Sequence, residues 1–103
     1  MDFSNYLENK LIDATVRGVG YSTTLKVYMA LFKTNPTKAD IGIEVAGASY
    51  TRPNATFAAP VNGVSKNSGQ ISYAVATTDW GEAGWVGIMD SKEGGNLLYF
   101  AAL

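Results

Sequence analysis

The feature that most constrains the fold of this chain is a dense apolar run at residues 24–32. The run contains Leu25, Val27, Tyr28, Met29, Leu31 and Phe32. It is far shorter than the ~20 apolar residues that span a bilayer, so we expect no membrane segment and no membrane partner. Its length and its branched and aromatic side chains are typical of a β-strand that is buried on both faces.

A helix is predicted at the N-terminus, over residues 3–16. Apolar side chains recur there at helical spacing, at Phe3, Leu7, Leu11 and Ala14. Ser4 is able to cap the start of the helix, and Gly18 stands where a left-handed residue commonly ends one. A helix that covers the core is favoured over an arm that binds a partner.

Short strands separated by turns are predicted for the rest of the chain. They lie at residues 41–46, 49–57, 70–75, 84–89 and 96–103. Turn-forming residues occupy the gaps, and Gly94 and Gly95 end the loop between the last two strands. Pro53 cannot donate a hydrogen bond to a sheet, which places the strand that contains it at an edge or a bend.

Strands of this length and spacing are typical of a sandwich or a small barrel. We therefore predict one mainly β domain over residues 1–103. It would consist of a helical segment at residues 1–20 and a small antiparallel β-sandwich, jelly-roll-like or immunoglobulin-like, at residues 21–103.

The composition argues against an active site. The chain has no histidine and no cysteine, which removes the commonest general base, the commonest metal ligand and all thiol chemistry. Its net charge is −1, and no basic cluster is present, so we expect no nucleic-acid partner. The acidic residues are scattered and do not suggest the paired carboxylates of a glycosidase. We predict no enzymatic activity, no metal and no cofactor.

Two residues deserve separate consideration as candidates. Glu44 lies in a predicted strand beside Ile43 and Val45, where pairing with Arg52 or a place on a solvent face is favoured over catalysis. Trp80 falls in a turn segment, where it would either plug the end of the sandwich or anchor a neighbouring subunit. The plug is the favoured interpretation.

Eight short motifs, each different from the others, follow one another along almost the whole chain. They are residues 5–10 (NYLENK), 27–32 (VYMALF), 34–36 (TNP), 44–45 (EV), 50–52 (YTR), 76–81 (ATTDWG), 87–90 (GIMD) and 94–98 (GGNLL). In this ordered set the chain resembles a family of short phage virion proteins, usually labelled phage tail fibre proteins. The resemblance implies a structural role in the virion, with no catalytic or cofactor residues.

The residues that match recurring positions of that family are Glu44, Arg52, Asp79, Trp80, Gly94, Gly95 and Asn96. Their expected roles are structural: turn geometry for the glycines and Asn96, an end plug for Trp80, and an ion pair between Glu44 and Arg52. The C-terminal residues Leu98, Phe100 and Leu103 are added as docking candidates, because a chain end can reach the sheet edge of a neighbour.

The family label implies a fibre, but the chain is short and has no shaft repeat and no separate receptor tip, so the function we expect is that of a capsid cement or decoration protein. It would form homotrimers, bind the major capsid protein and stabilise the coat lattice by interface burial. The alternative is a tail-fibre or baseplate component that contacts the host and binds tail proteins. The chain opens without a secretion signal, so we expect synthesis and assembly in the bacterial host cytoplasm and a final location in the virion.

Overall fold

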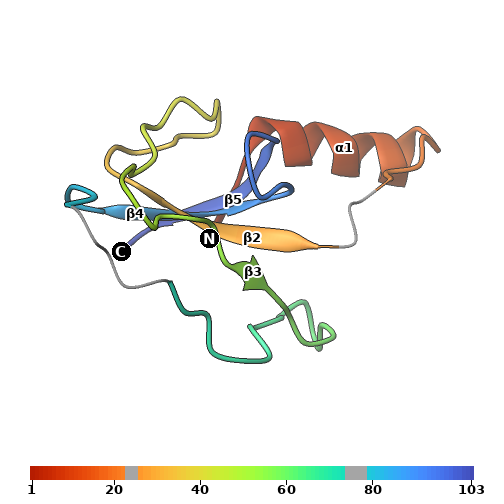
Figure 1. The fold of residues 1–103 in the computed structure, drawn as a ribbon. Helices are drawn as coiled ribbons and strands as arrows, with labels where there is room; N and C mark the ends of the chain where they lie inside the picture. Colours follow the sequence, from red (N-terminus) through yellow and green to blue (C-terminus); the bar gives the residue numbers. More distant parts are fainter. Residues whose placement is uncertain (23–25, 74–78) are drawn as a thin grey trace.

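The fold is built on one antiparallel sheet and one helix (Figure 1). The computed structural model describes residues 1–22, 26–73 and 79–103. Its elements are, in chain order, β1 (Asp2–Phe3), α1 (Asn5–Val16), β2 (Val27–Phe32), β3 (Asn54–Ala55), β4 (Trp85–Met89) and β5 (Leu97–Ala102). The strand order is β1-β5-β4-β2-β3, and every pairing is antiparallel.

The helix α1 follows the local signals of the sequence. It begins after Ser4, whose hydroxyl accepts a hydrogen bond from the Leu7 amide at 3.1 Å and so caps the first turn. The same buried hydroxyl donates to the Leu97 carbonyl of β5, which ties the helix start to the sheet. Gly18 follows the helix with φ +69°, as expected for a left-handed end. The predicted helix is confirmed, with its first residue at Asn5.

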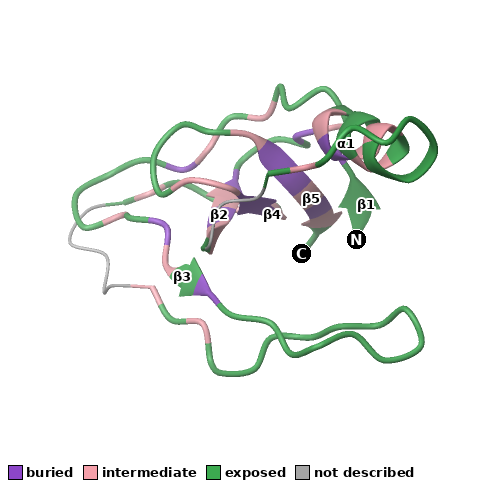
Figure 2. Ribbon diagram, turned by 90° about the vertical axis from the view of Figure 1, so that its right-hand side faces the viewer, coloured by how far each residue is buried: buried purple, intermediate pink, exposed green. Residues whose placement is uncertain are grey.

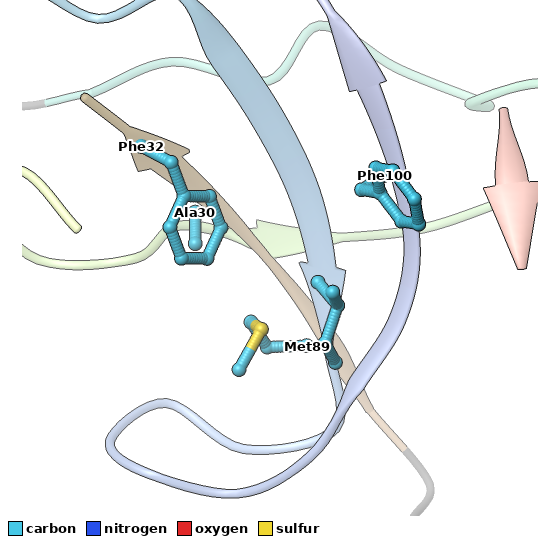
Figure 3. Close-up of a cluster of buried hydrophobic side chains, with 5 residues drawn as sticks. Ala30, Phe32, Met89 and Phe100 are labelled. Carbon is cyan, nitrogen blue, oxygen red and sulfur yellow. The ribbon is translucent and has the colours of Figure 1, made fainter. Parts of the chain in front are cut away.

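The main hydrophobic core lies on one face of the three long strands. Figure 3 shows its side chains, which come from β2, β4 and β5: Ala30, Phe32, Met89, Leu97 and Phe100. We call this the Phe32 face. The segment 33–46 closes it, because Pro36 is buried and Gly42 lies directly against Pro36 and the Phe32 ring.

The opposite face of the sheet carries Val27, Met29, Ile88 and Tyr99, as the strand register requires. We call it the Ile88 face. Leu7 of α1 packs with Ile88 and Leu98 at one end of it, and Tyr6, Leu11 and Tyr21 add to this smaller cluster. The Ile88 face is therefore only partly covered by the helix.

The predicted sandwich is wrong, because the described residues form a single open sheet without a second sheet packed on it. Segment 41–46 contributes only a bridge between Glu44 and Phe32, and Ile41 and Ile43 are exposed. Segment 49–57 shortens to β3, which does lie at a sheet edge as Pro53 suggested. Residues 70–73 are not a strand, and residues 74 and 75 of that prediction lie outside the described part of the chain.

The strand predicted at residues 24–32 is present as β2, with residues 24 and 25 outside the described ranges. Its expected burial on both faces is found only in part. Ala30 and Phe32 are buried, whereas Val27, Met29 and Leu31 are half-buried, because the Ile88 face lacks a full covering layer. The last two strands are confirmed as β4 and β5.

Candidate assembly surface

The first candidate region is centred on the Arg52 guanidinium, which is buried. Its Nη2 and Nε donate to the two carboxylate oxygens of Glu44 at 2.7 and 2.8 Å, a bidentate arrangement. Its Nη1 donates to the carbonyls of Ser91 and Gly94 at 2.9 and 2.8 Å. The predicted ion pair is therefore confirmed, and it also fastens the β4–β5 loop to the segment before β3.

Two tyrosine hydroxyls complete the hydrogen bonding along the outer edge of β2. Tyr50 accepts from the Leu31 amide at 3.2 Å and donates to the Glu44 carboxylate. Tyr73 donates to the Met29 carbonyl at 2.8 Å. The two rings stack at 6.2 Å with an interplanar angle of 10°. Side chains thus satisfy backbone groups that a neighbouring strand would otherwise bind.

Trp80 packs against the Tyr50 and Tyr73 rings. Its Nε1 donates to the Ala48 carbonyl at 2.8 Å, and its ring meets the Tyr50 ring edge-on at 5.1 Å. The preceding Asp79 accepts from the Gly81 amide at 2.8 Å, which shapes the turn that presents the indole. Trp80 therefore contacts its own chain at the margin of the sheet, and the end of a sandwich that it was expected to plug is not present in the described residues.

Burial and hydrogen bonding oppose each other in this cluster. Burial raises the pKa of the Glu44 carboxyl, but the hydrogen bonds from Arg52 and Tyr50 and the charge of Arg52 outweigh it and lower that pKa below its ordinary value. Burial and the hydrogen bond to Glu44 raise the pKa of Tyr50, and burial raises the pKa of Tyr73 to about 12. At neutral pH the cluster therefore holds one carboxylate, one guanidinium and two neutral phenols.

The β4–β5 loop supplies the remaining motif residues. Gly94 and Gly95 adopt φ values of +60° and +76°, which a side chain would disfavour. The Asp90 carboxylate accepts from the Asn96 amide at 2.7 Å and from Asn96 Nδ2 at 3.1 Å, closing the loop. Beside this loop lies a pocket of about 240 Å³, lined by Glu44, Tyr50, Thr51, Arg52, Lys92, Glu93 and Gly94.

The second candidate region is an apolar groove of about 620 Å³ on the Ile88 face. It lies between the sheet and a hairpin-like segment at residues 57–67, which Figure 2 shows as an exposed excursion beyond β3. Its lining residues are Met1, Phe3, Val27, Phe57, Pro60, Gly63, Val64, Ser65, Ile88, Leu98 and Tyr99. Most of the described lining residues are apolar, and of these Met1, Phe3, Phe57 and Val64 are exposed.

The three C-terminal docking candidates differ in how far the folded chain buries them. Leu98 and Phe100 are buried in the chain's own clusters, whereas Leu103 is 71% exposed. The groove residues of the 57–67 segment were not among the sequence candidates. The sequence does contain a signal for an apolar surface in this segment. Its apolar residues Phe57, Val61 and Val64 stand among turn-forming residues, where they cannot form a long strand.

The described residues show neither a metal-holding cluster nor a membrane-spanning helix. They contain no group of three or more acidic side chains placed to hold a metal ion. No helix in the described ranges is long and apolar enough to cross a bilayer. The side chains of the polar cluster hydrogen-bond to one another and to the backbone. The groove is an apolar surface, and its exposure to water is unfavourable in free energy.

Comparison with known families shows the family of this chain. Residues 2–103 match the family described as Podophage GP4 fiber I protein gp80. The chain belongs to this phage fibre family. A search of curated proteins finds no match to the chain.

Membership in the gp80 fibre family confirms the resemblance to a phage virion protein. It implies a fibre component of the virion, so it favours the tail-fibre alternative over the capsid-cement hypothesis. The family is one of structural fibre proteins and is not known as enzymatic.

Proposed function

We propose that this chain is a non-enzymatic module of a phage fibre that joins neighbouring fibre subunits by burying apolar surface. Family membership over residues 2–103 supports the fibre location. The observation that supports the mode of action is the apolar groove on the Ile88 face. Apolar surface gains roughly 25 cal/mol for each Å² removed from water, so covering the groove would favour assembly.

The polar cluster has a supporting role in this function. Arg52 links Glu44 to the β4–β5 loop, and Tyr50 and Tyr73 close the β2 edge. A closed edge discourages uncontrolled strand pairing with other chains. The module can then associate through the groove on its Ile88 face while its sheet edge stays covered.

Labelling of intact virions tests the location. A peptide tag added after the exposed Leu103 is expected to bind gold-conjugated antibody on the fibres of purified particles in electron micrographs. Untagged virions serve as the control for background labelling. Gold over the capsid shell, with the fibres bare, would contradict the proposal and restore the cement hypothesis.

A second candidate function, contact with the host surface, is favoured by the pocket beside Arg52, which carries Lys92 and Glu93 at its rim. Charged groups of both signs around a small pocket suit a polar surface ligand. Lys92→Ala is expected to weaken binding of the purified protein to host cells, and Lys66→Ala, at an exposed site away from the pocket, is the matched control. Absence of binding by the unaltered protein would exclude this function.

A further inference from the structure

The hairpin-like segment 57–67 turns at Asn62 and Gly63. Val61 and Val64 exchange two backbone hydrogen bonds across this pair, at 2.9 and 3.0 Å. Asn62 and Gly63 have φ values of +52° and +77°, and positive φ at both central residues is the mark of a type I′ turn. Asn-Gly is also the pair in which an asparagine side chain reacts most readily with its own backbone, because glycine has no side chain to crowd the attacking nitrogen.

The reaction open to this pair is deamidation. The Gly63 amide nitrogen gives up its proton and attacks the side-chain carbonyl carbon of Asn62. A new C–N bond forms, the bond to the side-chain nitrogen breaks, and ammonia leaves with the proton. Water then opens the five-membered succinimide ring at either carbonyl, which yields aspartate or isoaspartate. The sequence is a substitution followed by a hydrolysis, so it needs no oxidant or reductant, and it adds one negative charge.

Both reacting groups are accessible. Asn62 and Gly63 are exposed, and a methyl group added to Gly63 would meet no atom within 4 Å apart from its chain neighbours. Neither the Asn62 side chain nor the Gly63 amide forms a hydrogen bond with another described residue. The attacking nitrogen and the carboxamide are therefore both open to water and to each other once the backbone allows them to meet.

The closed turn keeps the two groups apart. In a type I′ turn the Gly63 nitrogen lies nearly opposite the Asn62 side chain about the Cα–C bond of Asn62, so the hairpin must open before attack. Every residue from 56 to 70 is exposed, and segments without buried contacts open locally at low free energy. Gly63, Val64 and Ser65 line the groove, so whatever covers the groove would also hold the hairpin closed.

The new carboxylate would lie at the margin of an apolar surface. Gly63 and Val64, which follow Asn62 directly, line the groove on the Ile88 face. A carboxylate that is taken out of water without a partner opposes burial of the surface around it. Deamidation would therefore make the groove of an unassembled chain harder to cover, and the change is one-way.

We propose that Asn62 is a site of spontaneous deamidation in the free chain and that covering of the groove in the fibre protects it. The modification distinguishes chains that assemble promptly from chains that age outside a particle. The protection rests on the proposed fibre function, whereas the modification of the free chain does not.

The first test follows the purified full chain at mildly alkaline pH, where more of the backbone amide is deprotonated. Peptide mapping by mass spectrometry measures conversion at each asparagine. Asn67 is the internal control, because it is exposed in the same segment and shares its opening but is followed by Ser68. Asn62 is expected to convert roughly tenfold or more faster than Asn67. Equal rates would overturn the modification site, as would an intact Asn62 under conditions that convert a free peptide of residues 56–70.

Purified virions incubated under the same conditions test the protection. Asn62 in assembled chains is expected to convert roughly tenfold or more slowly than in the free chain, since a covered groove lowers the population of the open hairpin. Equal conversion in both samples would overturn the protection. The free chain is measured without any virion, so an unreactive Asn62 there refutes only this inference, and gold label over the capsid refutes only the fibre location.

Discussion

Replacement of Arg52 by Met is the most informative single perturbation of this fold. Arg52 is 8% exposed, and its guanidinium donates to Glu44 and to the carbonyls of Ser91 and Gly94. Met has a similar length but no donors. The change would therefore leave the Glu44 carboxylate with only the Tyr50 hydroxyl, and would leave two loop carbonyls without this donor.

The expected cost follows from the burial of the pair. Removal of one partner from a buried ion pair destabilises a protein by about 3–5 kcal/mol. The Glu44 side chain is 25% exposed, so water can partly solvate the orphaned carboxylate. We therefore expect the lower end, about 3 kcal/mol. That is a large part of the 5–15 kcal/mol typical of a domain, and corresponds to a fall in Tm of roughly 12–24 °C.

Urea denaturation followed by circular dichroism measures this difference. The matched control is Arg17→Met, which removes the helix-surface pair of Arg17 with Asp13, whose side chains are 66% and 32% exposed. Exposed helical pairs contribute about 0.3–0.5 kcal/mol, so the control should be nearly neutral. A loss below about 1 kcal/mol for Arg52→Met, or a loss equal to that of the control, would refute the structural role assigned to this cluster.

Three further substitutions test other parts of the fold by the same unfolding assay. Glu44→Gln should destabilise the protein at neutral pH. Because the pKa of Glu44 is lower in the folded state, the difference in unfolding free energy from the parent should shrink as the pH falls below the ordinary range of a glutamate, and a difference that is constant with pH would contradict the argument. Gly87→Ala should cost about 1–3 kcal/mol, since its methyl group would stand 2.7 and 2.8 Å from two core side chains, whereas Gly84→Ala, with open space, should be tolerated; equal effects would count against the packing. Ser4→Ala should cost about 1–2 kcal/mol through the lost helix cap and its buried bond to β5, and a neutral result would show that the cap is dispensable.

Local signals explain the elements that were predicted correctly. The α1 helix combines helical apolar spacing with a Ser4 cap and a Gly18 end, all within one short segment. The β4 and β5 strands are apolar runs on either side of a turn that carries Gly94 and Gly95. Such elements depend on neighbours in the sequence, and for this reason a single sequence suffices to predict them.

The middle of the chain was predicted less well because long-range contacts decide its structure. The segments around Ile41 and Tyr50 have strand-like composition but form almost no ladder. Side chains meet the needs of the β2 edge instead, through Tyr50 and Tyr73. The number of layers could not be inferred from strand spacing, since the same spacing fits a closed sandwich and an open sheet.

The same division applies to the candidate site. Sequence motifs by themselves indicated a phage virion protein, and the pairing of Glu44 with Arg52 was predicted from the chain alone. Only the tertiary structure showed that Arg52 also holds the β4–β5 loop, 39 and 42 residues away, and that the Ile88 face ends in an apolar groove. The physical reason is that motifs record residue types at neighbouring positions, whereas a surface left uncovered depends on where every distant segment packs.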